Sequence, residues 1–222
     1  MDSQLELIAH RHCKRAYLDQ PVPREILQQV FEAAANAPSS QNNQPWELAV
    51  LVGEARDGLS AKLCKDFDEG VAPNPDYQNR PKEMPKLLAA RTSEYGQAFF
   101  DYKGIDRNDE AARKAHRREN FVFFGAPVEL IFHLPANAAA GTFLDLGLFM
   151  QNVMLGLRLH GLSSCPQFSV ASYSNTVRGH LGLSKDRIII SGMAVGFADE
   201  AASINRFVPA RAPTTEFVCW FE

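Results

Sequence analysis

The stretch GTFLDLGLFMQNVMLGLRLH, residues Gly141–His160, carries the strongest helix pattern in the chain. Apolar and amide side chains recur along it at helical spacing, and Gly161 is the expected stop signal. The recurring positions are Leu144, Leu148, Gln151, Leu155 and Leu159. Short apolar runs bounded by turn residues predict buried strands elsewhere in the chain. These runs are Glu47–Val52, Val128–Leu134 and Ile188–Val195.

Helical periodicity and proline breaks indicate the remaining elements. A first helix is expected from Leu5 to about Cys13, and a second between Pro23 and Pro38. The other predicted helices are Gly53–Phe67, Lys86–Tyr102, Arg107–Asn120 and Ser174–Leu181, with a short segment at Ser164–Ser169. Glu69–Pro85 holds four prolines, which predicts a loop or lid-like insertion.

Composition places the chain among ordinary globular proteins. It has 222 residues, 45% of them hydrophobic and 22% charged, so wholesale disorder is excluded. A net charge of −3 gives no general attraction to nucleic acid or to an anionic membrane. No apolar run approaches the roughly 18 residues that span a bilayer. The four scattered cysteines form no CxxC pair, and no signal-peptide pattern is found, so we expect reduced thiols in a cytoplasmic protein.

Several common catalytic and binding motifs are absent from the sequence. There is no GxGxxG after a strand, no GxxxxGK[ST], no HExxH and no GxSxG. The six histidines show no metal-ligand spacing, so no metal site is expected. The function must therefore depend on other polar clusters.

Two basic clusters are candidates for binding an anion. One lies within five residues near the end of the first helix, and the other just before the tail. Their members are Arg11, His12, Lys14 and Arg15, and Arg206 and Arg211. The simplest interpretation is a solvated charged surface. The alternative is a phosphate site built from two remote segments, because planar guanidinium groups clamp phosphate oxygens.

Two polar loops are the second group of candidates. Ala37–Trp46, APSSQNNQPW, concentrates amides and hydroxyls, which suit the mixed donor and acceptor edge of a flavin ring. Gly161–Phe168, GLSSCPQF, offers backbone N–H groups and an apolar wall. Either loop is also compatible with an ordinary hydrogen-bonded turn.

The tail Thr215–Glu222, TEFVCWFE, is unusually apolar for a chain end. It is consistent with a last strand of the chain's own sheet. It is equally consistent with an arm that adds to the sheet of a partner subunit.

Taken together, these segments resemble the FMN-dependent nitroreductase family, and its nitrobenzoate-type members in particular. The match covers nearly the whole chain, with six motifs in the family's order. They are Arg11–Arg15 (RHCKR), APSSQNNQPW, FFGAPVELIF (Phe123–Phe132), LDLGLFMQNVMLGLRLHGL (Leu144–Leu162), SCPQ and INRFVPARAP. The chain departs from the family at Cys13, where serine is commoner, and at Val208–Pro209, where a further basic residue is common.

The resemblance implies an α+β fold with a mixed central sheet flanked by helices. It also implies a homodimer with FMN at the subunit interface and a C-terminal arm exchanged between subunits. We therefore expect one nitroreductase-like domain over residues 1–222. Residues 69–120 form an excursion near the active site, and residues 212–222 form the arm.

The resemblance also assigns a cofactor site with no catalytic side chain. Arg11, Arg15 and Arg211 hold the FMN phosphate, and Cys13 contributes a weak S–H beside His12. Residues of the amide-rich loop meet the flavin, partly from the neighbouring subunit; they are Pro38, Ser39, Ser40, Asn42 and Gln44. The turn Pro166, Gln167 and Phe168 lines the ring, with a backbone N–H directed at N5.

The implied activity is the transfer of two electrons from NADH or NADPH to a small aromatic acceptor. Nitroaromatics are the expected acceptors, with quinones as a further class. Because one site serves donor and acceptor in turn, ping-pong kinetics are expected. Alternatives on the same scaffold are a reductive dehalogenase, an enone reductase or a flavin-binding protein without turnover.

Seven aromatic residues in or directly after the excursion have two interpretations. They supply stacking walls over the flavin, or they pack in the core; they are Tyr95, Phe99, Phe100, Tyr102, Phe121, Phe123 and Phe124.

Overall fold

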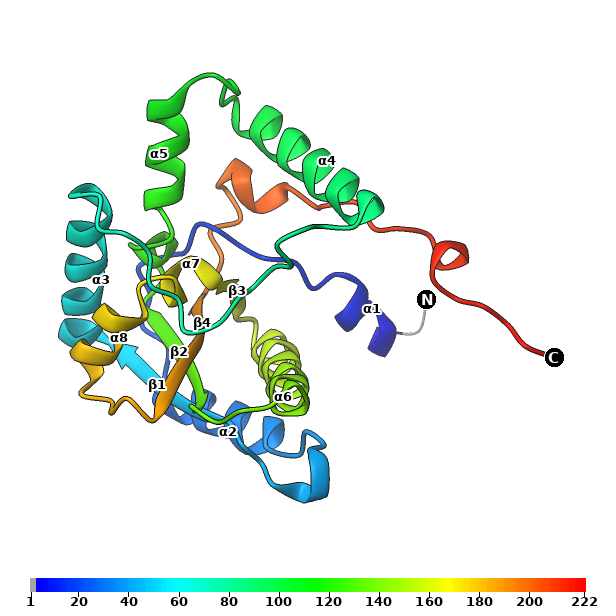
Figure 1. Ribbon diagram of the computed structural model, residues 1–222, viewed down its shortest axis with the longest axis horizontal. Coiled ribbons are helices and arrows are strands. Elements are labelled where there is room, and N and C mark those ends of the chain that lie inside the picture. The colour runs from blue at the N-terminus through cyan, green and yellow to red at the C-terminus, as the bar shows by residue number, and fades with distance from the viewer. Residues whose placement is uncertain (1–2) are drawn as a thin grey trace.

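The computed structural model describes residues 3–222 and contains one four-stranded sheet (Figure 1). The strands are β1 (Glu47–Val52), β2 (Val128–Pro135), β3 (Ser163–Gln167) and β4 (Arg187–Gly196), in the order β1-β2-β4-β3. The three predicted strands are confirmed, and the short segment predicted near Ser164 is the fourth. The α+β fold is confirmed as well. Every pairing among the described residues is antiparallel, so the expected mixed sheet is not found within one chain.

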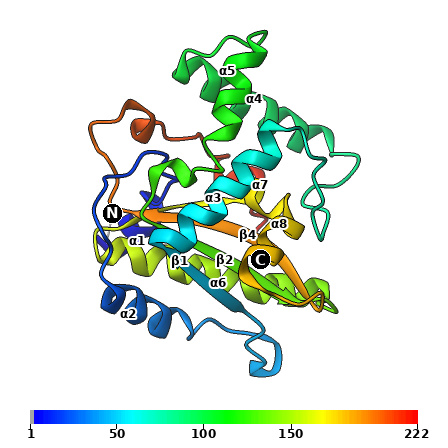
Figure 2. The same ribbon diagram turned by 90° about the vertical axis from the view of Figure 1, so that its left-hand side faces the viewer.

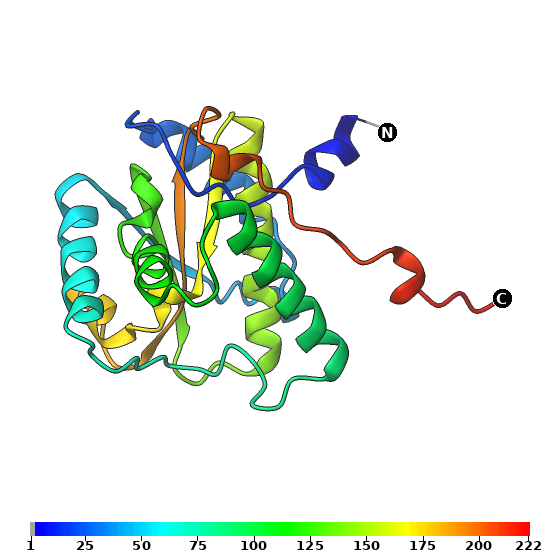
Figure 3. The same ribbon diagram turned by 90° about the horizontal axis from the view of Figure 1, so that it is seen from above.

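Helices cover both faces of this sheet (Figure 3). One face packs against α2 (Arg24–Ala34) and α6 (Ala140–Leu159), and the other against α3 (Gly53–Asp68), α7 (Phe168–Ala171) and α8 (Ser174–Leu181). Successive residues of a strand point to opposite faces. In β2, Leu130 and Phe132 therefore join the α2–α6 side, while Ile131 joins the α3–α8 side. Burial on both faces explains why β2 reads as a continuous apolar run.

Helix α6 is the element whose orientation the sequence predicts least well. Its buried side chains include Leu146, Phe149, Val153 and Leu157. The predicted leucine stripe lies mostly on the other face, where Leu159 is 73% exposed. Apolar on both faces, α6 is the one described helix long and apolar enough to cross a membrane by length and composition. This corrects the expectation that no such run exists, although its buried side chains belong to the sheet core.

The remaining helices stand away from the sheet (Figure 1). They are α1 (Ser3–Ala9), α4 (Lys86–Lys103) and α5 (Glu110–Arg118), with 3-10 turns at Ser40–Asn42, Phe123–Gly125, Ser203–Arg206 and Thr214–Glu216. Helix α1 ends before the predicted Cys13 because the following residues lie along the sheet. There the Lys14 amide donates to the Ser164 carbonyl at 3.4 Å, and Tyr17 forms a bridge with Ala198.

The tail runs away from the body of the molecule (Figures 1 and 3). After the turn Thr214–Glu216 it has no regular structure, and it pairs with none of the four strands. Trp220 is 86% exposed and Phe221 is 94% exposed. The interpretation that the tail completes its own chain's sheet is therefore wrong.

Candidate functional site

A cavity of about 990 Å³ opens between the end of β3, helices α4 and α5, and the loop that precedes α4. Its volume is at the upper end of the range for small-molecule sites, roughly 300–1,000 Å³. The lining combines aromatic, amide and basic side chains. These include Arg15, Tyr77, Arg80, Tyr95, Phe99, Phe100, Arg113, His116, Arg117, Asn120, Phe124, Pro166, Gln167 and Phe168.

The predicted turn Pro166–Phe168 lies in the wall of this cavity. It is positioned by the pairing of β3 with β4, in which Gln167 is opposite Gly192. The side-chain Nε2 of Gln167 donates to the Asn120 carbonyl at 2.7 Å. Its Oε1 is buried and has no hydrogen-bond partner within the described part of the chain. An acceptor of this kind is available to a donor on a bound ligand.

Arg15 reaches the same cavity from the N-terminal segment. Its backbone N–H donates to the Asn205 side chain at 2.7 Å, which ties this segment to the region before the tail. The guanidinium carbon lies 4.9 Å from the centre of the Phe99 ring, and Nη2 donates to the Tyr95 hydroxyl at 3.2 Å. The basic cluster thus supplies one cation to the wall that holds the turn.

Cys13 lies close to this cation. Hydrogen bonding to the Cys165 thiol, assisted by the positive charges of Arg15 and Arg11, lowers the pKa of Cys13 to about 6 against the opposing effect of burial. The same contact and its own burial raise the pKa of Cys165. At neutral pH the thiol pair therefore carries negative charge on Cys13 beside two arginines. His12 turns away, with Nδ1 at 2.9 Å from the His10 carbonyl oxygen, and burial lowers its pKa.

Arg211 lines a neighbouring cavity of about 580 Å³ between α4 and residues 207–216. Its Nη1 donates to the carbonyls of Pro209 and Ala210 at 3.0 and 3.1 Å. Tyr95 lines both cavities. Among the described residues no contact joins Arg211 to Arg15. The Arg211 side chain would therefore have to move before both residues could contact one phosphate group.

The amide-rich loop lies at the opposite end of the molecule from α5 (Figures 1 and 2). Its residues do not line the cavity, and most of its side chains are exposed. The backbone N–H of Ser40 donates to the Asp145 carboxylate at 3.3 Å, and the hydroxyl of Ser39 accepts from the Gln44 amide at 3.0 Å. Pro38 precedes these contacts and is itself exposed.

The same loop has a strained backbone. Gln41, Asn42 and Gln44 have φ of 52°, 58° and 45°, which is the left-handed region that favours glycine. Such strain persists where surrounding contacts hold it, and it clusters at binding sites. This loop does not line the cavity of its own chain, so within one chain it does not meet the turn Pro166–Phe168.

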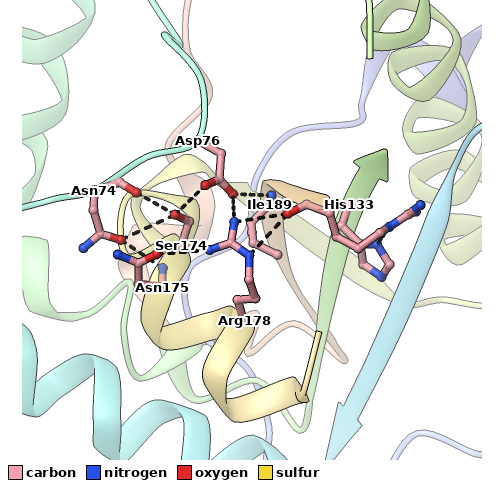
Figure 4. Close-up of polar contacts among 8 residues, drawn as sticks. Asn74, Asp76, His133, Ser174, Asn175, Arg178 and Ile189 are labelled. Atoms are coloured by element: carbon pink, nitrogen blue, oxygen red, sulfur yellow. Dashed lines mark hydrogen bonds and ion pairs between the residues drawn. The ribbon is translucent and has the colours of Figure 1, made fainter. Parts of the chain in front are cut away.

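The sequence did not reveal what fixes the loop before α4. Asp76 accepts hydrogen bonds from the Ser174 hydroxyl at 3.0 Å and the Ile189 amide at 2.7 Å, and it pairs with the Arg178 guanidinium at 2.5 Å (Figure 4). Tyr77, the next residue, donates its hydroxyl hydrogen to the Ile190 carbonyl at 2.9 Å. This proline-rich loop is therefore a fixed wall of the cavity, and its spacing alone gave no signal of that.

The aromatic residues of the excursion divide between site and core. Tyr95, Phe99, Phe100 and Phe124 line the cavity. Phe121 and Phe123 are buried in the core beside α3, and Tyr102 packs against Phe207 at 5.3 Å between ring centres. The core interpretation is confirmed for Phe121 and Phe123, and the position of the four cavity-lining residues leaves their stacking role a prediction.

Comparison with known proteins agrees with the motifs. The model of the nitroreductase family matches residues 8–197. The chain is 38% identical to a 4-nitrobenzoate reductase of Pseudomonas putida, over 90% of this chain and 87% of that protein. It superposes with a TM-score of 0.96 and 38% identity on the FMN- and NADPH-dependent nitroreductase NfnB of Sphigopyxis sp. strain HMH, over 99% of both chains. For the FMN-dependent NfnB of Mycobacterium smegmatis in complex with NADPH, the TM-score is 0.95 at 32% identity, over 99% of this chain and 98% of that one.

Proposed function

The chain belongs to the nitroreductase family, and from this premise we propose that it is an FMN-dependent oxidoreductase acting on nitroaromatics. It transfers two electrons from NADH or NADPH to the acceptor. The single observation that carries this proposal is the cavity in which Arg15 and the Pro166–Phe168 turn meet. The whole chain around that cavity has the fold of an enzyme described as FMN- and NADPH-dependent.

The cavity residues fit a flavin. Its volume of about 990 Å³ accommodates a cofactor and a second aromatic molecule, and the unpaired Oε1 of Gln167 offers an acceptor to a ring N–H. Arg15 would bind the phosphate from the cavity wall, with Arg11 of the same segment as a second cation, and Phe99 and Phe168 supply apolar surface to the cavity. When bound, FMN supplies the hydride chemistry, so the protein's role is binding, orientation and electrostatics.

A positive charge or N–H donor beside the flavin ring would favour the reduced cofactor, because such groups stabilise a developing anion. No side chain is assigned as nucleophile or general base. Donor and acceptor occupy the same cavity in turn, which predicts ping-pong kinetics.

We further propose a cytoplasmic homodimer as the working enzyme. The apolar outward face of α6, with Leu144 and Leu159 exposed, and the exposed Trp220 and Phe221 of the tail are surfaces that a second copy would bury. A second copy would also bring its residues 38–44 toward the cavity. This arrangement supports the assignment of Ser39, Ser40 and Asn42 as flavin contacts from the partner.

The proposal is tested with the purified protein by visible spectroscopy. Yellow protein that bleaches anaerobically with NADPH or NADH, and regains colour with 4-nitrobenzoate, is the expected result. Colourless protein that cannot be loaded with FMN would refute the cofactor assignment. Faster reoxidation by a halophenol than by a nitroaromatic would move the enzyme to another acceptor class.

Arg15→Ala tests the phosphate assignment. A charged hydrogen bond contributes about 1.5–3 kcal/mol, so FMN should bind about tenfold to a hundredfold more weakly, as measured by flavin fluorescence titration. The backbone contact of residue 15 with Asn205 is retained, so the thermal midpoint should change little. Arg24→Ala, at an exposed position on α2, is the matched control. Equal FMN affinity in both variants would show that Arg15 does not hold the phosphate.

A further inference from the structure

The cavity wall carries more positive charge than one phosphate requires. Among the described residues that line it, no aspartate or glutamate is present. The basic residues are Arg15, Arg80, Arg113, His116 and Arg117. The chain as a whole has a net charge of −3, so this basic lining is a local feature. If Arg15 holds the flavin phosphate, three arginines remain without an assigned partner.

These three arginines also lack acidic partners among residues 3–222. Their neighbour Arg118, on another face of α5, pairs with Asp68 at 2.9 Å. By contrast, Arg80 and Arg117 make no side-chain hydrogen bond or ion pair within residues 3–222. Arg80 and Arg117 are exposed at the cavity wall, whereas Arg113 is partly buried. Several unneutralised arginines on one wall together attract an anion.

Arg113 is held in place by its neighbours, and its Nε–H donor is unused within residues 3–222. Its Nη1 donates to the Arg107 carbonyl at 3.0 Å, and its guanidinium carbon lies 5.4 Å from the centre of the Phe100 ring. Its Nε is buried and has no partner in the described part of the chain. Leaving a buried N–H without an acceptor is unfavourable, and a ligand oxygen would supply the missing acceptor.

Two parts of the backbone, helix α5 and the loop before α4, place these cations along the same cavity. Arg113 and Arg117 are four residues apart on α5 and therefore share a face. The helix is capped by Asp109, whose carboxylate accepts from the Ala112 amide at 2.8 Å. Arg80 follows the segment that Asp76 fixes against α8 and β4. The positions of these charges are thus built into the fold.

We propose that Arg80, Arg113 and Arg117 form a second anion site, which binds an oxygen anion carried by one of the enzyme's two substrates. That anion is the carboxylate of a nitrobenzoate-type acceptor or the 2′-phosphate of NADPH. Both groups match the planar donor geometry of guanidinium. The surrounding rings of Tyr95 and Phe124 supply a wall for an aromatic substrate. This inference rests on the proposed function of the cavity.

The test is calorimetric titration of the FMN-loaded protein with probes that cannot be reduced. Benzoate is compared with benzamide, and 2′,5′-ADP with 5′-AMP, so that each pair differs in one anionic group. In one of the two pairs, the probe with the additional anionic group should bind the double variant Arg113→Gln/Arg117→Gln about tenfold or more weakly than it binds the parent. Its counterpart should bind as before. Lys114→Gln, on the same helix but outside this cavity, should leave all four affinities unchanged.

Each outcome has a definite meaning. A loss confined to benzoate identifies the acceptor carboxylate, and a loss confined to 2′,5′-ADP identifies the donor phosphate. No loss, or an equal loss for both members of each pair, would overturn the second anion site. Failure of the proposed function is recognised separately, as FMN-loaded protein that neither bleaches with NADPH nor reduces a nitroaromatic.

Discussion

Two irregular, proline-containing segments behave in opposite ways in this molecule. Residues 69–85 have little regular structure, yet Asp76 ties them to α8 and β4 through a buried ion pair and two hydrogen bonds (Figure 4). Residues 207–222 are similarly irregular. Beyond residue 213 their described polar contact with the body is the exposed ion pair of Glu216 with Arg91, at 2.6 Å.

The first segment has its hydrogen-bond and packing partners within its own chain, whereas, among the described residues, the end of the second does not. The first segment anchors Asp76 and Tyr77 to the sheet and α8 and supplies a cavity wall, although most of its other side chains are exposed. The second leaves the side chains of Trp220 and Phe221 exposed to water. Burying this apolar area against another surface would be favourable. Irregular structure therefore does not imply mobility, and the partners of each segment decide its role.

The largest effect is expected from breaking the fixed segment. Asp76→Ala removes the carboxylate partner of the partly buried Arg178 and the acceptor of the Ser174 and Ile189 bonds, while Arg178 keeps its bond to the Arg187 carbonyl. The expected cost is about 3 kcal/mol of folding stability. Urea denaturation at pH 7 measures this loss. Asp57→Ala removes an exposed ion pair with Arg56 and should cost less than about 1 kcal/mol. Equal losses in the two variants would mean that Asp76 does not fasten the loop.

The next effect concerns the tail. Trp220→Ala should weaken dimerisation by about 2 kcal/mol or more, roughly thirtyfold in the dissociation constant, while the subunit fold is retained. Sedimentation equilibrium over a concentration series measures this change. Val71→Ala, an exposed apolar position in the fixed segment, is the control and should leave the dimer unchanged. A Trp220 variant that remains dimeric at the lowest concentration would exclude an exchanged arm.

The smallest effect is a pH dependence of subunit folding, which the tail should not share. Burial and the charge of Arg187 lower the pKa of His133, which accepts a hydrogen bond from Arg187 Nε at 3.2 Å. The Arg187 carbonyl in turn accepts from Arg178, the partner of Asp76. In the unfolded chain His133 becomes protonated below about pH 6.5, whereas in the folded chain it stays neutral to lower pH.

Protons then bind preferentially to the unfolded chain, so stability falls as pH drops below about 6.5. The slope from this residue is at most about 1.4 kcal/mol per pH unit. Urea midpoints at several pH values should show a flatter dependence for His133→Gln than for the parent. His160→Gln, at an exposed position, should keep the parent slope. Dimer dissociation should lack this dependence, because the tail has no histidine.

Much of the fold follows from local patterns. Strand Glu47–Val52 and helix Ser174–Leu181 have the predicted bounds, since proline, glycine and apolar periodicity act over a few residues. Helix α1 is the exception, because contacts of Lys14 with β3 draw the chain out of the helix. The family is also recognisable from the order of its motifs, and its model matches residues 8–197.

For the site, the sequence by itself determined which chemistry is present: arginines near the N-terminus, an amide-rich loop and the turn Pro166–Phe168. Only the tertiary structure decided which of these meet. It brings Arg15 to the turn, leaves Ser39 and Ser40 remote, and adds Arg113 and Arg117, which read as ordinary surface charges. The reason is physical. Periodicity records which face of a helix is apolar, whereas convergence depends on sheet order and on contacts between residues about a hundred positions apart, such as Asp76 and Arg178.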